Sequence, residues 1–314
     1  MTNSGDFFLT SLSSFLPDEQ LLVNQSLKPF TSFGSGGIAG VLVKLNNIGE
    51  LTQLIKTCEQ FKKKWLIIGK GSNTIFSDNV LKAVLVTFQG EFKKIELIEP
   101  TIVKAGTAVS NEKMAAFAHK NNLSGIEFMS TIPGSIGGAV FMNAGAHGTE
   151  IKDILHSVEV LDDQHKALSL YPKQLDFSYR HSIFHCESWS IISASFKLVS
   201  DEMEKIKEKE MLLKQGRKKS QPIDKRTWGS VFKNPEGLFA GKLIEECNLK
   251  GKGHGKAKIS EKHANFIENI HQSATFTDAV MTIKMAKDAV KNKYGIELIE
   301  EVRIYNDDGD LINI

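Results

Sequence analysis

Residues 125–148 read Gly125-Ile-Glu-Phe-Met-Ser-Thr-Ile-Pro-Gly-Ser-Ile-Gly-Gly-Ala-Val-Phe-Met-Asn-Ala-Gly-Ala-His-Gly148, with a dense cluster of glycines from Gly134 onward. Glycine permits positive φ and close backbone approach but costs entropy on folding, so such a cluster needs a structural reason. Either the backbone packs on itself in a tight turn, or its N–H groups approach an anion such as a pyrophosphate. Apolar residues, among them Ile132, Ile136 and Val140, are interleaved with the glycines. This mixture favours an ordered, half-buried loop against a large and partly apolar ligand.

Two further glycine loops precede this stretch, at 34–37 and at 69–73. The second, Gly69-Lys-Gly-Ser-Asn73, follows the apolar run 65–68, which predicts a buried strand. Ligands of α/β sheets bind at such carboxyl ends of strands. The pattern G-x-x-x-x-G-K-[ST] is not met, so the loop does not indicate a nucleoside triphosphatase.

Composition describes an ordinary soluble protein. The 314 residues leave room for two or three domains, and 39 basic against 37 acidic residues give no overall signal for nucleic acid or anionic membrane. The N-terminus has no signal-peptide pattern, and no apolar stretch is long enough to span a bilayer. The three cysteines are far apart and not in metal-ligand spacing, which predicts reduced thiols, no metal site and a cytoplasmic location.

Apolar patterns along the chain predict an α+β protein. Strands are expected at 41–45, 65–68, 83–88, 101–105 and 189–198, together with a hairpin over 157–170. The helical pattern between the first two strands predicts a strand–helix–strand unit with parallel pairing. The charged stretch 201–219 predicts an exposed helix and a domain boundary near residue 200.

The last third of the chain predicts a separate domain. A helix is expected at 240–247, and another is expected to be capped by Thr277 and ended by Gly295. Alternation predicts a final strand over 296–305 with one apolar face, on which Glu300 is an exception.

The motifs together resemble the UDP-N-acetylenolpyruvoylglucosamine reductase family, in family order and over about 31–305. The matching segments are Thr31–Gly34, Gly69–Asn73, Ile132–Gly138, Met142–Gly148, Tyr179–Ser182, Gly229–Pro235, Ser260–Ile267 and Glu301–Arg303. The single glycine loops are weak signals, whereas Gly-Ser-x-Phe-Lys-Asn-Pro at 229–235 after both loops is highly specific. Arg180 and Ser230 are 50 positions apart. This short spacing resembles the subclass of the family with the shorter connection, which lacks a substrate-covering tyrosine loop.

The resemblance implies an FAD-binding fold of the vanillyl-alcohol-oxidase (PCMH) type, with two subdomains and a third α+β substrate domain. The expected ranges are 1–88 and 89–200 for the FAD-binding subdomains and 201–314 for the substrate domain. It also implies non-covalent FAD and NADPH as hydride donor. The implied cofactor-binding residues are Gly69, Lys70, Gly71, Ser72, Asn73, Ile132, Pro133, Gly134, Ser135, Gly137, Gly138, Asn143, Ala144, Gly145 and Gly148.

Three catalytic positions carry over from the resemblance: Arg180, Ser230 and Glu301. The implied reaction reduces the double bond of a UDP-sugar enolpyruvyl ether in peptidoglycan precursor synthesis, by hydride addition at C3 and protonation at C2. The fixed charge and planar fork of Arg180 suit the substrate carboxylate, on which negative charge develops. Glu301 can assist if burial keeps it protonated, and Ser230 would deliver the proton. Lys233, Asn234 and, more weakly, Arg217 are candidates for the substrate diphosphate.

Lys256 and Lys258 occupy a segment where Gly and Gln are common in the family, and Gly40 replaces a commonly acidic residue. Thr227-Trp228 stands where small residues are usual, which predicts an altered approach to Ser230. An FAD-linked oxidase of the same fold superfamily would explain the glycine loops but not the 229–235 motif. His147, the one histidine of the organising stretch 125–148, could carry flavin covalently in such an oxidase. The basic cluster within 214–226 could bind nucleic acid, although neighbouring acidic residues favour a solvated helix end.

Overall fold

The computed structural model describes residues 4–314, which form two compact units. The first unit comprises the described residues up to Gln20, Lys44–Phe61 and Val86–Arg217, and the second comprises Leu21–Val43, Lys62–Leu85 and Lys218–Ile314. Helices and short strands are mixed in both, which confirms the α+β class. The three domain ranges expected from the sequence stay a prediction.

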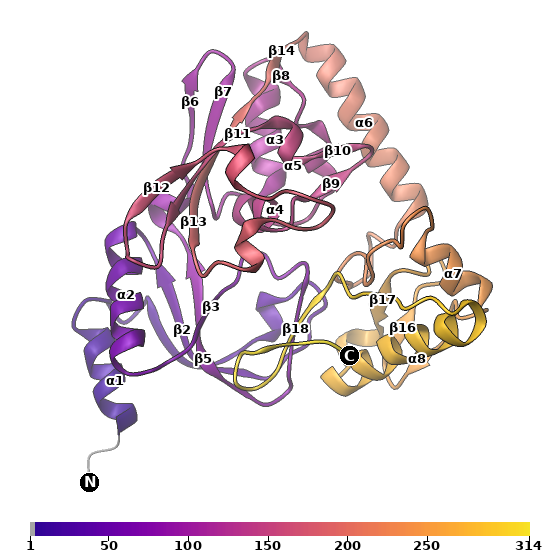
Figure 1. Cartoon of the computed structure of the whole chain (residues 1–314), viewed down its shortest axis with the longest axis horizontal. Helices are drawn as coiled ribbons and strands as arrows, with labels where there is room; N and C mark the ends of the chain where they lie inside the picture. The colour runs from indigo at the N-terminus through magenta and orange to yellow at the C-terminus, as the bar shows by residue number, and fades with distance from the viewer. Residues whose placement is uncertain (1–3) are drawn as a thin grey trace. The chain divides into compact units, whose positions relative to one another are not determined.

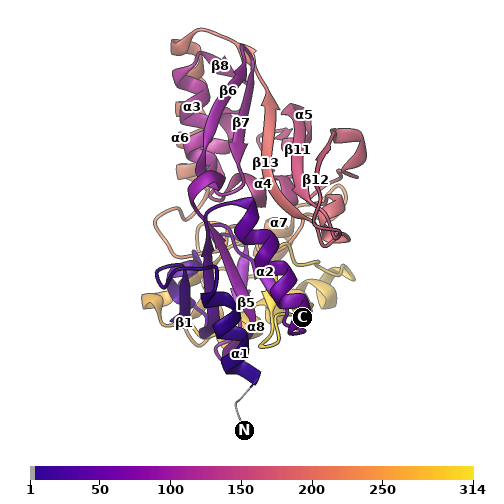
Figure 2. The ribbon, with the colours of Figure 1, turned by 90° about the vertical axis from the view of Figure 1, so that its left-hand side faces the viewer.

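The first unit is built on a five-stranded antiparallel sheet of order β12-β11-β13-β7-β6. Its strands are β6 (Ile95–Glu99), β7 (Ile102–Gly106), β11 (Leu155–Leu161), β12 (Ala167–Leu170) and β13 (Ser190–Lys197). Helices α3 (Asn111–Lys120) and α4 (Ile136–Phe141) lie on one face of this sheet (Figures 1 and 2) and share a hydrophobic core with it. The hairpin predicted over 157–170 is confirmed as β11 and β12.

The organising stretch is mostly regular structure. It contains a 3₁₀ turn, η3 (Glu127–Thr131), then α4 and the short strand β9 (Gly145–Ala146); β10 (Thr149–Glu150) and α5 (Ile151–Ile154) follow directly after it. Ile136 and Val140 are fully buried, so the interleaved apolar residues anchor the stretch in the core. The remaining elements of the first unit include α1 (Ser4–Ser13), α2 (Ile48–Gln60), η2 (Gly90–Lys93), β8 (Leu123–Ser124), η4 (Pro172–Gln174), η5 (Ile183–His185), β14 (Val199–Ser200) and most of α6 (Met203–Ser220).

The second unit contains a four-stranded sheet of order β1-β2-β5-β3. Its strands are β1 (Leu21–Ser26), β2 (Ile38–Leu45), β3 (Trp65–Ile67) and β5 (Val80–Phe88), and the last residues of β2 and β5 belong to the first unit. The predicted parallel pairing of the strands on either side of α2 is wrong. The later strand β5 is inserted between β2 and β3, a long-range pairing that local periodicity does not reveal.

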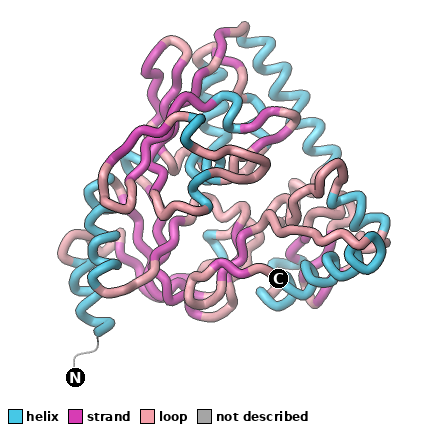
Figure 3. The backbone as a smooth tube through the Cα atoms, in the orientation of Figure 1, coloured by secondary structure: helices cyan, strands magenta, loops and turns pink. Residues whose placement is uncertain are grey.

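The C-terminal part of the second unit has short strands and two helices. Strand β18 (Arg303–Tyr305) runs parallel to β4 (Thr74–Phe76) and antiparallel to β19 (Leu311–Ile312). Helix α8 (Phe276–Tyr294) lies beside the sheet of β15 (Gly253–His254), β16 (Ala257–Ile259) and β17 (Ile267–Asn269), as Figures 1 and 3 show. The other elements are η1 (Lys28–Phe30), α7 (Ala240–Glu246) and η6 (Ile270–Gln272).

Two predictions for this part need correction. The hydroxyl that caps α8 belongs to Thr275, which accepts a hydrogen bond from Asp278 N at 3.0 Å, and not to Thr277. Thr275 is the better cap because its own N–H also donates to the Asp278 carboxylate, which completes a capping box. The final strand is limited to β18, although Leu298, Val302 and Ile304 are buried as the alternation predicts.

Glu300, the exception on that apolar face, pairs with Lys287 of α8 at 2.6 Å, so the buried carboxylate is compensated. Gly295 ends α8 in the left-handed conformation, as predicted. No helix among residues 4–314 is long and apolar enough to cross a membrane.

Candidate active site

Ser230 and Glu301 lie on neighbouring segments of the second unit. Glu301 N donates to Val231 O at 2.8 Å, and Lys233 N donates to Ile299 O at 2.9 Å. These bonds pair the segment of the specific motif 229–235 with the segment that carries Glu301, and the structure therefore brings two of the three predicted catalytic residues together. Sequence reasoning placed both in the last domain, but their pairing depends on contacts about seventy residues apart.

The residues on either side of Ser230 are firmly anchored. Trp228 is 2% exposed and stacks on Phe33, with ring centroids 3.6 Å apart, and Phe232 is also 2% exposed. The bulky Trp228 therefore fills the core, and its effect on the approach to Ser230 stays a prediction. Ser230 itself is half-buried, and within residues 4–314 its hydroxyl makes no hydrogen bond to the protein.

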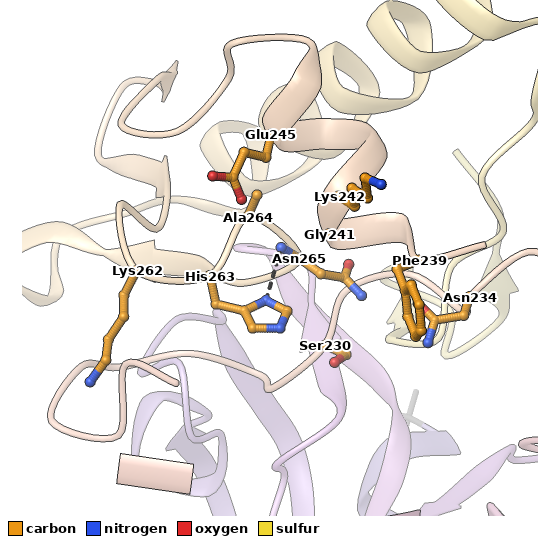
Figure 4. Close-up of a pocket in the computed structure, with 10 residues that line it drawn as sticks. All are labelled: Ser230, Asn234, Phe239, Gly241, Lys242, Glu245, Lys262, His263, Ala264 and Asn265. Atoms are coloured by element: carbon orange, nitrogen blue, oxygen red, sulfur yellow. Dashed lines mark hydrogen bonds between the residues drawn. The ribbon is translucent and has the colours of Figure 1, made fainter. Parts of the chain in front are cut away.

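Ser230 lines a pocket of about 310 Å³ in the second unit (Figure 4). One side of the pocket comes from α7, and the other comes from the 260–267 motif and the 229–235 motif. The lining residues are Ser230, Asn234, Phe239, Gly241, Lys242, Glu245, Lys262, His263, Ala264 and Asn265. Lys242 and Lys262 outnumber the single carboxylate of Glu245, and the other polar side chains are uncharged, which makes this pocket suitable for a polar, anionic ligand.

His263 is held in one tautomer at the edge of this pocket. Its Nδ1 lies 3.2 Å from Asn265 N and accepts that N–H, so the neutral ring carries its proton on Nε2. Burial lowers the pKa of His263 below its usual value; the charge of Lys250 adds to this decrease, and Glu245 opposes it. The ring packs against α7 at Gly241, where a Cβ would lie 3.2 Å from the His263 Cε1 atom.

We expect the lowered pKa of His263 to make the fold acid-sensitive. The unfolded chain binds the proton more tightly than the folded chain, so His263 costs stability as the pH falls below about 6.5, its usual pKa. His263→Asn keeps an acceptor for Asn265 N but does not titrate. Histidine titrates between about pH 5 and 8, so thermal unfolding is measured across this range. The variant should lose less stability on acidification than the unsubstituted protein. Parallel acid profiles for the two proteins would contradict the assignment.

The 69–73 loop is tied to the segment of Glu301. The carboxamide of Asn73 donates to Glu301 O at 3.0 Å, and Arg303 N donates to Asn73 O at 3.0 Å. Gly71 has φ 60°, and a Cβ there would lie 1.9 Å from Phe30 O. This glycine is therefore required by close packing of the protein on itself. Gly69 and Lys70 are exposed.

Arg180 lies in the first unit at a tight turn. Ser178 and His181 exchange backbone hydrogen bonds of 3.3 and 3.2 Å, and Arg180 between them has φ 55°. A non-glycine residue in this region carries a backbone cost of about 1–3 kcal/mol, which often accompanies a functional role. The guanidinium donates from Nη2 to Gly145 O at 3.0 Å, and its Nη1 lies 3.8 Å from Glu150 Oε1.

Asn143 holds this turn from inside the protein. It is fully buried, and its carboxamide nitrogen donates to Glu150 Oε2 at 3.0 Å and to Ser178 O at 2.9 Å. Its oxygen accepts from Lys152 N at 3.0 Å. These bonds give Asn143 a role in orienting Glu150 and the turn of Arg180, and its contact with FAD stays a prediction.

The glycines of the organising stretch differ in their physical reason. A Cβ on Gly137 would lie 1.9 Å from Thr107 Oγ1, and Gly137 N donates to Thr107 O at 2.9 Å. The amides of Ile132 and Ile136 likewise donate to backbone carbonyls within the unit. Gly138, by contrast, is exposed, and a Cβ there would approach only Ser135 Oγ, at 3.7 Å. Gly138 is therefore open at its Cα, with its N–H donating to Ser135 Oγ at 3.5 Å, whereas Gly137 is enclosed by Thr107.

The predicted substrate residues lie in different settings. Lys233 and Asn234 follow Ser230, and Asn234 Oδ1 accepts from Ala240 N at the start of α7 at 3.0 Å. Arg217 is half-buried at the end of the first unit, and burial lowers its pKa. Sequence reasoning did not assign roles to Lys242, Glu245, Lys262 or His263, although Lys262 and His263 stand inside the recognised 260–267 motif.

Comparison with protein families agrees with both halves of this description. The model for the C-terminal domain of UDP-N-acetylenolpyruvoylglucosamine reductase matches residues 221–305, which include Ser230 and Glu301. The model of an FAD binding domain matches residues 39–170, which include the loops at 69–73 and 132–138.

Relatives of known name match almost the whole chain. The UDP-N-acetylenolpyruvoylglucosamine reductase of Caldanaerobacter subterraneus subsp. tengcongensis is 39% identical over 96% of this chain and 98% of its own length. That of Clostridium novyi is 37% identical over 95% of this chain and 96% of its own length. The crystal structure of the enzyme from Thermus caldophilus superposes with a TM-score of 0.79 at 30% identity, over 90% of this chain and 99% of that one. The chain therefore belongs to the UDP-N-acetylenolpyruvoylglucosamine reductase family and has its FAD-binding fold.

Proposed function

We propose that this FAD-dependent oxidoreductase reduces UDP-N-acetylglucosamine enolpyruvate to UDP-N-acetylmuramate, with electrons from NADPH, in the synthesis of peptidoglycan precursors. The observation that carries the proposal is the setting of Ser230. Its hydroxyl lines a polar pocket, makes no hydrogen bond to the protein within residues 4–314, and lies on the segment paired with that of Glu301. Family membership favours this reductase function over an oxidase or a nucleic-acid-binding module.

The chain offers suitable backbone for FAD in each unit. Gly69 and Lys70 of one loop and Gly138 of the other are exposed. At Gly138 an added Cβ would approach only Ser135 Oγ, at 3.7 Å. Reduced by NADPH, bound FAD supplies the hydride that the reaction needs. The residues proposed to hold FAD are those of the 69–73 and 132–138 loops with Asn143, Ala144, Gly145 and Gly148. Within the second loop, Gly137 packs against Thr107 and bonds to its carbonyl, so Gly137 contributes by shaping the loop.

Alanine should lower the stability of the protein at Gly137 but not at Gly138. Gly137→Ala forces a Cβ onto Thr107 and should destabilise the protein by about 1–3 kcal/mol, the usual cost of overpacking. Gly138→Ala has room, and it should keep or raise the stability of the FAD-free protein, because alanine favours a helix over glycine by about 1 kcal/mol. We expect Gly138→Ala to lower FAD affinity, measured by fluorescence titration of the FAD-free protein. Unchanged affinity would remove Gly138 from the cofactor surface.

Three residues are proposed to manage charge and the proton. Hydride addition at C3 leaves negative charge at C2 that spreads into the substrate carboxylate. Arg180 binds that carboxylate through its planar, permanently charged guanidinium, and Glu301 completes the stabilisation of the enolate. Ser230 then donates its Oγ proton to C2, which yields the saturated lactyl ether. The resulting alkoxide regains a proton from solvent.

The diphosphate of the substrate is proposed to contact Lys233 and Asn234, with Arg217 as a further candidate. Lys242 and Lys262 add positive charge to the same pocket in which Ser230 lies. Since nucleotide-sugar precursors and NADPH are cytoplasmic metabolites, we place the enzyme in the cytoplasm.

Absorbance spectroscopy tests the function directly. The purified holoenzyme should show the visible bands of oxidised flavin, and NADPH should bleach them under anaerobic conditions. UDP-N-acetylglucosamine enolpyruvate should restore them in stoichiometric amount and yield a product heavier by two hydrogens. Bands restored by oxygen but not by this substrate would instead indicate an oxidase.

A further inference from the structure

The side chain of Asn265 bonds to the backbone of Phe232, two residues after Ser230, as a neighbouring β-strand would. Its Oδ1 accepts from Phe232 N at 2.9 Å, and its Nδ2 donates to Phe232 O at 2.8 Å. Its backbone oxygen also accepts from Val231 N at 2.9 Å. Asn265 is only 3% exposed, so these bonds are sheltered from competing water.

The same segment is bound on its other side by the chain that carries Glu301. Phe232 forms a bridge with Glu300, and Val231 O accepts from Glu301 N. Both polar groups of the Phe232 backbone turn to Asn265. The segment immediately after Ser230 is therefore held from both sides, and the buried Phe232 ring limits any rotation.

The segment before Ser230 provides less guidance. Gly229 has φ 80°, and no heavy atom lies within 4 Å of where its Cβ would be. Trp228 is anchored, but this open glycine stands between it and the serine. Among residues 4–314, Gly229 N donates only to Thr227 Oγ1 of its own loop, at 3.3 Å, so the Phe232 side of Ser230, where Asn265 binds, is the side with more contacts to other segments.

We propose that Asn265 is a positioning residue for proton delivery, which fixes the Ser230 hydroxyl against the protonated carbon of the substrate by clamping the Phe232 backbone. This inference rests on the proposed role of Ser230. A carboxamide of this length suits the task, because it presents a donor and an acceptor to one residue at once. Aspartate keeps the acceptor but loses the donor, and it leaves the buried Phe232 carbonyl without its partner.

The test combines Asn265→Asp with Ser230→Ala and measures both half-reactions by stopped flow. In the presence of Ser230, Asn265→Asp should slow reoxidation by the enolpyruvyl substrate about ten- to a hundredfold, the scale of a displacement of about 1 Å. Reduction by NADPH should change little. In the Ser230→Ala background, Asn265→Asp should have no further effect on reoxidation, because no hydroxyl remains to be positioned. Asn265→Ser serves in the same cycle if the aspartate variant does not fold.

Asn269 offers a matched control. It is 6% exposed, and its carboxamide also clamps backbone, by donating to Phe33 O and accepting from Ala274 N, both at 2.8 Å. Any effect of Asn269→Asp should be the same with and without Ser230. If Asn265→Asp behaves in this additive way while Ser230→Ala alone is severely slowed, the positioning role is overturned and the acid role stands. A near wild-type Ser230→Ala rate would overturn the proposed mechanism itself.

Discussion

Replacing Ser230 by alanine should slow reoxidation of the reduced enzyme by the enolpyruvyl substrate at least about a hundredfold, the usual scale for a lost general acid. The hydroxyl makes no hydrogen bond to the protein within residues 4–314, and the flanking Trp228 and Phe232 are anchored by their own contacts. The substitution therefore removes a proton donor without removing a contact of the fold. FAD should stay bound, and NADPH should still bleach it. Stopped-flow absorbance of the flavin separates the two half-reactions.

Cysteine at the same position provides the control. A thiol also donates a proton, so Ser230→Cys should retain more activity than Ser230→Ala, although the larger sulfur will not occupy the same position. If alanine and cysteine both reoxidise at the wild-type rate, Ser230 is an ordinary loop residue and another group must protonate the substrate.

The sequence predicted where the glycine loops lie better than it predicted why their glycines are there. The glycine cluster correctly marked an ordered stretch next to the core. Close packing explains Gly137, which faces Thr107 at a distance that excludes a Cβ, as it also explains Gly71 in the earlier loop; Gly138 has room for a Cβ, and its contact with a ligand stays a prediction. A glycine in a sequence is compatible with close packing, with a positive φ or with neither, and only the folded neighbours show which applies.

Long-range contacts account for what the sequence did not predict. Strand β5 separates β2 from β3, and the Phe232 backbone depends on Asn265, which lies 33 positions away. Asn265 stands at an unspecified position of the recognised motif Ser-x-Lys-His-Ala-x-Phe-Ile, so the resemblance implied no role for it. The cap of α8, by contrast, is decided by a local contact: Thr275 forms a reciprocal capping box with Asp278, two residues before the predicted Thr277.

Arg180→Lys should slow reoxidation by the substrate about a hundredfold, although lysine keeps the positive charge. A loss of this size is typical when one donor to a developing oxyanion is removed. The guanidinium has several donors in a fixed plane: Nη2 is held by Gly145 O, and Glu150 lies beside Nη1. An ammonium group cannot satisfy Gly145 and also present two parallel N–H groups to a carboxylate. Reduction by NADPH should be largely unaffected, and stopped-flow measurement of both half-reactions decides the point.

Arg180→Gly separates the guanidinium from the turn that carries it. Glycine adopts the observed φ of 55° without the cost that arginine bears, so the backbone bonds between Ser178 and His181 should persist. This variant should lose at least as much activity as Arg180→Lys while its thermal unfolding shows that the turn is tolerated. An equal fall in both half-reactions of the lysine variant would indicate general misfolding. Reoxidation at the wild-type rate in either variant would show that the substrate carboxylate is bound by another residue, and that the strained conformation of Arg180 serves the Gly145 and Glu150 contacts alone.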